Sequence, residues 1–440
     1  MPSNEFIRRS AIVQEMLGEE AEKLGRESGF VERQSKMTGA GFATTLILGW
    51  LDNPQATLNE LIQGSQQLGI DISESGLHQR LNDRAVMFLK ALLERSVSLC
   101  QERQRLPAEV LQPFSQVNVL DSSIVTLPEE LSGLFAGSGQ RGCSASVKLQ
   151  LNFDYLTGAL NALEVLAGRT PDQRCDFHRQ FAQPNSLHLF DLGYFDQQVF
   201  KDLTQAQAYF VSRLQTQAAL YWASDDSQAV DLLAVLQSQP ARRGELTVYM
   251  GRHARVPVRL VFDRLPSSVV AERRRKAKAK ARKRGQTASP HRLALLEWAL
   301  FMTNVPADWL TPDQILVVYR VRWQAELVFK LWKSQAKLKC VGTCKPARVL
   351  CQFYARLVGV VLFHWSVAPW RFATMSELSL PKAFRILQRY ALRLLDAIAA
   401  GWTTVPDVLH RLAEDFLRFA PKNTRKKSPS TYQRLLLAEA

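Results

Sequence analysis

A single carboxylate stands among cations at helical spacing in residues 311–336. This stretch begins with Thr-Pro-Asp-Gln, a capping box with proline in the first turn, and its apolar residues recur with the period of an amphipathic helix. Five polar residues fall within an arc of about 80° on the other side of that helix: Tyr319, Arg322, Glu326, Lys330 and Lys333. Such a face could grip phosphates, or it could be a solvated stripe held by ion pairs four residues apart.

Two further carboxylates stand where predicted strands end. The apolar stretches Gln116–Leu120 and Ser186–Phe190 are typical of buried strands, and Asp121 and Asp191 follow them directly. Several carboxylates at one sheet edge repel one another unless a divalent metal ion lies among them. Hard Mg²⁺ held by carboxylates, next to cations that hold phosphates, is suited to phosphoryl transfer on a nucleic-acid backbone.

The elements that must position these groups follow one another in the order of the ribonuclease H fold. Three strands come first, and helices and strands then alternate. The predicted strands are 116–120, 146–153, 159–166, 186–190 and 208–213, and the predicted helices are 171–182 and 195–206. The sequence therefore predicts an α/β fold with a ribonuclease-H-like catalytic core.

Residues from about 215 to 310 do not continue that order and are predicted to form a mostly β insertion. Its strand candidates are Leu246–Met250, Val256–Phe262 and Leu293–Val305. Between the last two, nine of the twelve residues from Arg273 to Arg284 are Lys or Arg. We expect this basic run to be a mobile, solvated loop that adds phosphate attraction independent of DNA sequence.

Helical regions flank the catalytic core, which is predicted to span 111–340. The first, 1–110, is the predicted DNA-binding domain, and the second is 341–440. In the first, Thr57 opens an amphipathic stretch that stops at a glycine, and Ser73 can cap a second short helix. Helix, tight turn, helix is typical of DNA-reading units and equally of an ordinary helical hairpin. In a DNA-reading unit four side chains would face a groove: Ser75, His78, Gln79 and Arg80.

Composition narrows the class of protein. Of 440 residues, 46% are hydrophobic and 22% charged, a globular balance that excludes a disordered or fibrous chain. The net charge of +15 favours a polyanionic partner, nucleic acid or an anionic membrane. The most apolar run, Leu357–Phe363, is bounded by basic residues and is expected in a buried core helix, so no membrane partner is predicted. Because the sequence shows no signal or transit peptide, we expect a cytoplasmic protein.

The six cysteines are too sparse for a disulfide framework. Cys340, Cys344 and Cys351 lie close together, but without a second pair or a histidine motif they are only a weak zinc signal.

Three motifs resemble one family of enzymes. The spacing Tyr319-x2-Arg322-x3-Glu326-x6-Lys333 is similar to the signature helix of the DDE transposases of bacterial insertion sequences, in particular the insertion sequence 4 family. The segments VLDSS, with Asp121, and LFDLGYF, with Asp191, resemble the first and second acidic motifs of that family. The predicted β insertion, the segment WALFMTNVP and a tryptophan directly after the signature arginine also match.

The resemblance implies that Asp121, Asp191 and Glu326 are the catalytic metal ligands, for two Mg²⁺ ions with Mn²⁺ as a substitute. It implies that Tyr319, Arg322 and Lys333 grip the backbone of the transposon end. Further DNA-binding residues are expected around them: Lys330, Arg213, Trp298 and Trp323.

Two further positions, Trp298 and Leu192, bear on DNA contacts in this family. Some relatives flip a base near the cut and stack it on tryptophan, and Trp298 is placed to match, although a buried strand tryptophan is the simpler account. Leu192 stands where many relatives carry arginine, so the arginine of one phosphate contact is missing while the metal ligands are complete.

The predicted function is that of a DNA transposase. It would bind the ends of its insertion sequence, cleave the strands and join the 3′-hydroxyl ends to target DNA by two-metal phosphoryl transfer. The expected partner is double-stranded DNA, both transposon ends and target, bound by a homodimer at the bacterial nucleoid. Two alternatives stay open: a structure-selective nuclease on the same fold, and an inactive DNA-binding protein derived from a transposase.

Overall fold

The computed structural model divides the chain into two compact units, each built from three segments. The described residues are 4–101, 104–137, 144–339, 344–371, 377–423 and 429–438. The first unit comprises Met1–Pro107, Ser122–Thr170 and Ala325–Ser428, and the second comprises Ala108–Asp121, Pro171–Gln324 and Pro429–Ala440. The three functional domains predicted from the sequence stay a prediction.

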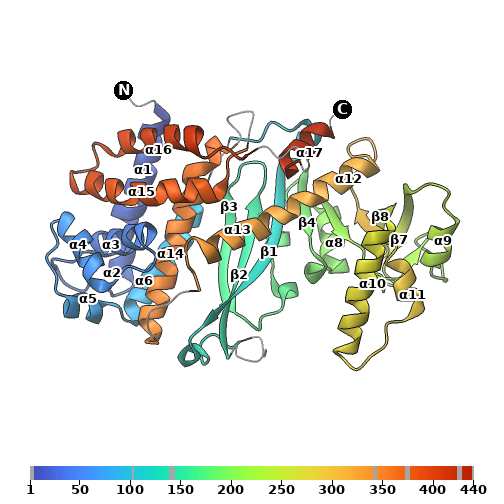
Figure 1. Cartoon of the computed structure of the whole chain (residues 1–440), viewed down its shortest axis with the longest axis horizontal. Helices are drawn as coiled ribbons and strands as arrows, with labels where there is room; N and C mark the ends of the chain where they lie inside the picture. The colour runs from blue at the N-terminus through green and yellow to red at the C-terminus, as the bar shows by residue number, and fades with distance from the viewer. Residues whose placement is uncertain are drawn as a thin grey trace. The chain divides into compact units, whose positions relative to one another are not determined.

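The second unit is built on a mixed sheet with the strand order β1-β4-β5-β9-β8-β7-β6 (Figure 1). Its strands are the first half of β1 (Gln116–Leu127), β4 (Ser186–Phe190), β5 (Tyr209–Arg213), β6 (Leu220–Tyr221), β7 (Arg243–Met250), β8 (Val256–Arg264) and β9 (Trp298–Thr303). Strands β1, β4 and β5 pair in parallel, and the other pairs are antiparallel. The strands of the insertion therefore extend the core sheet instead of forming a separate one.

Short helices and turns connect these strands. They are η2 (Glu109–Leu111), η4 (Asp172–Arg174), α7 (Phe177–Gln180), η5 (Leu192–Tyr194), α8 (Gln197–Gln205), α9 (Leu232–Ser238), α10 (Ser267–Arg282), α11 (Pro290–Leu295), α12 (Pro312–Tyr319), η6 (Arg320–Arg322) and α17 (Thr431–Leu437). Helix α8 links the parallel strands β4 and β5 and buries Val199, Phe200 and Leu203 on one side, as an amphipathic crossover helix must. The predicted α/β fold class is confirmed.

The first unit is mainly helical. Its helices are α1 (Asn4–Gln14), η1 (Glu15–Glu20), α2 (Ala21–Glu27), α3 (Gly39–Asp52), α4 (Leu58–Gln67), α5 (Glu74–Arg80), α6 (Asp83–Leu99), α13 (Trp323–Ser334, from Ala325 onward), α14 (Pro346–Val367), α15 (Leu380–Ala399) and α16 (Val405–Phe419). Its strands are the second half of β1, β2 (Ala145–Asp154) and β3 (Leu160–Ala167), in the order β3-β2-β1. Strands β2 and β3 pair antiparallel, as a meander requires.

Helix α14 forms the centre of the first unit, where it contacts α3 and α6 (Figure 1). Its residues from Val349 to Val367 are buried. By length and composition this helix could cross a membrane, but 83% of its most apolar window is buried inside the protein. The prediction of a buried core helix at Leu357–Phe363 is confirmed.

The strand that carries Asp121 is longer than predicted. We expected a strand that ends at Asp121, but β1 continues to Leu127. The two serines after Asp121 interrupt the apolar run, yet the β-branched residues Ile124, Val125 and Thr126 continue the extended conformation. Asp121 therefore lies inside a strand and not at its end.

The prediction of a mobile loop for the basic run is wrong, because most of the run forms helix α10. Alanine alternates with lysine from Lys276 to Lys280, and both residue types are good helix formers. Glu272 in addition forms ion pairs with Arg275 and Lys276, at i,i+3 and i,i+4 spacing on the helix.

Two smaller predictions also differ from the structure. The predicted strand at Leu293–Val305 begins only at Trp298, because Ser289 caps and Pro290 opens helix α11. The predicted helix at 171–182 is reduced to η4 and α7, which are separated by extended backbone at Cys175.

The predicted helix, turn and helix between Thr57 and Arg80 are confirmed as secondary structure. Thr57 forms a capping box on α4, and Ser73 caps α5 through the backbone N–H of Gly76. Gly69 lies in the turn with φ of 72°, a left-handed conformation that favours glycine. Whether α5 reads DNA stays a prediction.

Candidate active site

The two aspartates of the second unit lie at the same level of neighbouring parallel strands. The register of β1 and β4 runs from Gln116 opposite Ser186 to Val119 opposite Leu189. Two residues further along each chain are Asp121 in β1 and Asp191 directly after β4. Since neighbouring strands are about 4.8 Å apart, these carboxylates can share one ligand.

Arg322 places a cation against this pair of aspartates. Its Nη1 atom lies 3.6 Å from Oδ2 of Asp121, and the two side chains are only 13% and 15% exposed. Arg322 ends the 3₁₀ turn η6, which interrupts the helix that we predicted to be continuous from 311 to 336. Angles calculated for one straight α-helix therefore do not hold across this turn. Arg322 lies against Asp121, and its predicted role in gripping DNA stays a prediction.

Tyr319 anchors the end of α12 on the same strand. Its hydroxyl donates a 2.9 Å hydrogen bond to the carbonyl of Phe190, and the residue is only 6% exposed. Burial raises the pKa of Tyr319, while the nearby cations Arg213 and Arg322 lower it and Asp191 raises it further. The guanidinium of Arg213 lies 5.7 Å from the centre of the Tyr319 ring. Tyr319, Arg322 and Arg213 thus gather around the two aspartates.

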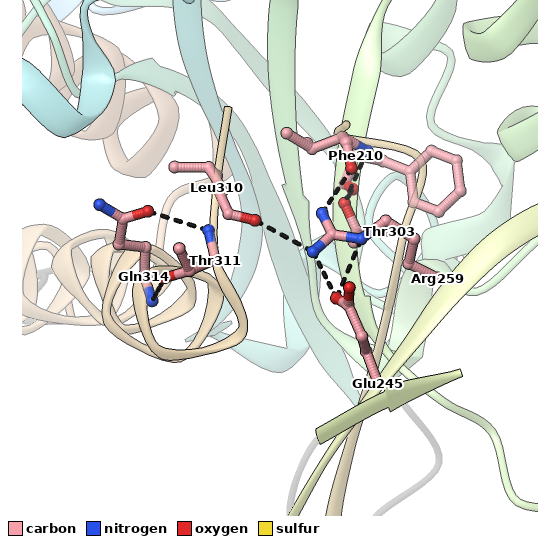
Figure 2. A network of polar contacts seen from close by, with 8 residues as sticks. Phe210, Glu245, Arg259, Thr303, Leu310, Thr311 and Gln314 are labelled. Atoms are coloured by element: carbon pink, nitrogen blue, oxygen red, sulfur yellow. Dashed lines mark hydrogen bonds and ion pairs between the residues drawn. The ribbon is translucent and has the colours of Figure 1, made fainter. Parts of the chain in front are cut away.

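The insertion strands brace the start of α12 (Figure 2). Arg259 in β8 donates hydrogen bonds to the carbonyls of Val305 at 2.6 Å and Leu310 at 3.0 Å, and it forms an ion pair with Glu245 in β7. Leu310 directly precedes Thr311, which forms with Gln314 the capping box of α12. Because these strands belong to the insertion, the insertion fixes where the signature helix begins.

A second brace lies beside the first. Arg243 in β7 forms ion pairs with Asp313, in the first turn of α12, and with Asp263 at 3.1 Å. The acidic residue at this helix N-terminus is also favourable for the helix dipole.

The other residues of the predicted face lie on α13 in the first unit. Lys333 Nζ donates a hydrogen bond to Oγ of Ser123 in β1, Lys330 is exposed, and Glu326 is partly exposed. Ser123 was not singled out by the sequence analysis, although it is part of the VLDSS motif. Its position two residues after Asp121, on the same face of a strand, was the available signal.

The predicted tryptophans differ in exposure. Trp298 is 4% exposed and packs edge-to-face on Phe262, with the guanidinium of Arg264 5.6 Å from the centre of its ring. Trp323 is 54% exposed. Trp298 therefore has the environment of a buried strand tryptophan, and its base-stacking role stays a prediction. Leu192 is 42% exposed beside Asp191.

Of the four residues predicted to face a DNA groove, two contact other side chains and two are exposed to solvent. The ring of His78 contacts Nζ of Lys345 at 2.9 Å, and Arg80 donates to Oγ of Ser35 at 3.3 Å. Ser75 and Gln79 are exposed.

The weak zinc signal gains no support. Cys351 is buried, and burial raises the pKa of its thiol. Cys344 is exposed, and Cys340 lies outside the described residues.

A ribonuclease-H-like sheet with two neighbouring aspartates and an arginine against them is the framework of enzymes that cleave and join nucleic-acid strands. The chain belongs to the family described as "Transposase DDE domain", whose sequence model matches residues 112–362. It is therefore an enzyme of DNA strand cleavage and transfer. The narrower assignment to the insertion sequence 4 family stays a prediction.

The relatives of this chain are transposases of insertion sequences. The chain is 28% identical to the transposase of element IS231E of Bacillus thuringiensis subsp. finitimus, over 92% of this chain and 89% of that protein. It is 25% identical to the transposase of IS1151 of Clostridium perfringens, over 95% and 93%. A solved piggyBac transposase synaptic complex with hairpin DNA matches 94% of this chain and 85% of that chain, with 11% identity and a TM-score of 0.45.

Enzymes of this family generally use divalent metal ions. Asp121 and Asp191 fit such an ion, because neighbouring carboxylates supply the hard oxygen ligands that Mg²⁺ prefers. Within the residues that the structure describes, no group of three or more His, Cys, Asp or Glu side chains that could hold a metal ion is found.

Proposed function

We propose that this enzyme binds the ends of its insertion sequence, cleaves the strands there and joins the freed 3′-hydroxyl ends to target DNA. The observation that carries the proposal is the parallel register that brings Asp121 beside Asp191, with Arg322 against them. Carboxylates and an arginine in this arrangement suit a phosphodiester, whose charge must be held while one P–O bond breaks and another forms.

We propose Glu326 as the third carboxylate, and with it a site for two Mg²⁺ ions that also accepts Mn²⁺. Glu326 follows Arg322 by about one helical turn, a rise of roughly 6 Å, and Arg322 is paired with Asp121. Bound Mg²⁺ would supply charge neutralisation for the attacking and leaving oxygens. The three carboxylates would hold it, and Arg322 would hold the phosphate beside it.

The remaining cations of this region would bind phosphates on either side of the cut. Lys333 and Lys330 lie one to two turns beyond Glu326 on α13, and Arg213 lies beside Tyr319 at the end of β5. The hydroxyl of Tyr319 donates its hydrogen bond to the carbonyl of Phe190, so this residue would position the helix. Exposed Trp323 would contact a base or sugar, and Trp298 could take up a base only after leaving its packing on Phe262.

A second DNA-binding surface is proposed on the last turns of α10, which is yellow in Figure 1, and on the turn that directly follows it. Five cations there are exposed: Lys278, Lys280, Arg282, Lys283 and Arg284. Within the described part of the chain, no ion pair joins them to an acidic residue. Their partner would be the DNA backbone, read without regard to sequence.

We further propose that the enzyme acts as a homodimer on DNA at the nucleoid of the bacterial cytoplasm. Two transposon ends must be held together for joining, and each copy of the chain carries the residues for one site. The helix, turn and helix of α4 and α5 would recognise the ends through exposed Ser75 and Gln79.

One assay tests the proposal against both alternatives. Wild-type protein, Mg²⁺, DNA carrying the inverted repeats that flank the gene, and a target plasmid are incubated, and nicked ends and joined products are counted. Nicks at the ends together with joined products are expected. Cutting without joining would mean a nuclease, and end binding without cutting would mean an inactive DNA-binding protein.

A further inference from the structure

The last helix of the chain, α17, lies beside the start of the signature helix in the second unit (Figure 1). Ser430 and Gln433 form its capping box, and Tyr432 and Leu435 are buried. A helix of seven residues is marginal by itself in water, so α17 depends on what it packs against. It packs mainly against α12 and η2.

Two side chains of the signature helix bind α17, one near each of its ends. Gln314, in the first turn of α12, donates to the carbonyl of Ala438 at 3.2 Å. Gln324, the second residue of α13, donates to Oγ1 of Thr431 at 3.1 Å and is only 5% exposed. The first contact lies before the 3₁₀ turn η6 and the second lies after it.

Two guanidinium groups, one on the turn and one on α17, influence each other. Burial lowers the pKa of Arg320, the first residue of η6, and the positive charge of Arg434 in α17 lowers it further. Like charges are therefore held near each other by the surrounding contacts. A 3₁₀ turn inside a helix is a point where the helix can bend, and η6 lies between Tyr319 and Glu326.

We propose that α17 holds the η6 turn in place by binding the helix on both sides of it, and we call α17 a splint in this sense. Gln324 and Thr431 are then positioning residues of the active site. By joining α12 to the first residues of α13, the splint fixes the turn that directs Arg322 toward Asp121. Neither residue would touch DNA or metal. The effect on DNA cleavage rests on the proposed function, whereas the effect on the turn does not.

The test uses the full-length chain and the substitution Thr431→Val, which removes the accepting hydroxyl at nearly constant shape. Thr431→Ser keeps the hydroxyl, and Thr403→Val is the matched control at an exposed threonine of another region. Amide hydrogen exchange of residues 320–324 should become about fivefold faster in Thr431→Val, and Thr431→Ser and Thr403→Val should exchange like wild type. Gln324→Met should match Thr431→Val, and the double variant should add nothing.

Cleavage gives the second readout. At saturating end DNA, the first-strand nicking rate of Thr431→Val should fall about fivefold, while end affinity and thermal stability stay close to wild type. Exchange unchanged in Thr431→Val, no rescue by serine, or faster exchange with unchanged nicking would each overturn the proposal. Wild-type protein that fails to nick would contradict the proposed function alone, because the exchange comparison decides about α17 by itself.

Discussion

Two groups of cations on helices of this protein differ in how they are held. Around the candidate active site, Arg322 is paired with Asp121 and Lys333 with Ser123, and both side chains are partly buried. On the last turns of α10, the five cations from Lys278 to Arg284 are exposed, and no acidic partner is found for them among the described residues. The first half of α10 is different again, because Arg274 bonds Glu297 and the carbonyl of Leu293.

This difference corresponds to two ways in which a cation can bind DNA phosphates: by holding one phosphate in a fixed position, or by attracting the DNA backbone in general. A cation that must be in one place relative to a scissile bond needs partners that restrict its side chain before DNA arrives. A cation that only raises local DNA concentration needs no partner, because counterion release depends on charge and not on a fixed geometry. The two groups should therefore fail differently when they are mutated.

The largest effect is expected at the aspartates of the candidate active site, next to Arg322. Asp191→Asn should lower strand cleavage about a thousandfold or more at any Mg²⁺ or Mn²⁺ concentration, because one of the proposed metal ligands is lost. End binding, followed by gel shift, should stay near wild type. Asp225→Asn changes an exposed aspartate of the same unit and serves as control. Normal cleavage by Asp191→Asn would sink the assignment.

The second largest effect is expected at Arg322, the cation that is paired with Asp121. Arg322→Ala should reduce the yield of stable complex on pre-cleaved end DNA about 10- to 100-fold, and Mn²⁺ should not restore it, because phosphate grip and not metal affinity is lost. Arg322→Lys keeps the charge without the fork of donors and should recover only part of the yield. Wild-type yield from Arg322→Ala would mean that this face is a solvated stripe.

A smaller and different effect is expected from the five exposed cations at the end of α10. Replacing the five cations between Lys278 and Arg284 by glutamine should flatten the salt dependence of DNA binding, by a slope of about 4.5 at most, and leave the preference for end sequences unchanged. The matched control is Arg275→Gln with Lys276→Gln, which removes two cations already paired with Glu272. A loss of end preference, or an equal slope change in the control, would contradict the comparison.

The smallest effect concerns two buried histidines, His188 and His364. Burial lowers the pKa of His188 in the second unit and of His364 in the first unit to about 3. The unfolded chain therefore binds protons below about pH 6.5 that the folded chain cannot bind, and stability must fall as the pH falls. Each histidine should cost about 1 kcal/mol between pH 6.5 and 5.5.

Urea unfolding at several pH values measures this loss. His188→Gln should unfold with a smaller pH dependence than wild type, and His253→Gln, at an exposed histidine, should keep the wild-type dependence. An unchanged slope in His188→Gln would mean that this histidine is already charged or solvated in the folded protein.

Patterns of residues adjacent in the sequence predicted the helices and strands whose formation depends mainly on such adjacent residues. The run from Ser186 to Phe190 is buried throughout and ends at an aspartate, so β4 was predicted to the residue. The end of β1 was missed because two serines resemble a break, although the β-branched residues that follow them favour an extended chain. Helix α10 was missed because a basic run carries no apolar period, although its alanines and Glu272 favour a helix.

The candidate site was predictable where one motif carries both the residue and its element. Asp191, which directly follows a buried strand, is of this kind. The bond of Tyr319 to Phe190, the contact of Lys333 with Ser123 and the hydrogen bond of Gln324 to Thr431 join residues more than a hundred positions apart. No local pattern encodes such pairs, because they arise only when the whole sheet has formed.

The division of each unit into three segments has a consequence for how the protein is made. The first unit needs Ala325–Ser428 and the second needs Pro429–Ala440, so during synthesis neither has all its segments until the final stretch has been translated. The contacts of α3 with α14 and α15, and those of α12 with α17, thus wait for late residues, so folding of both units is completed only after these segments are made. A nascent chain stalled or truncated before residue 325 would carry both aspartates without Glu326 and without the third segment of the first unit, and such an incomplete chain would be a substrate for proteases.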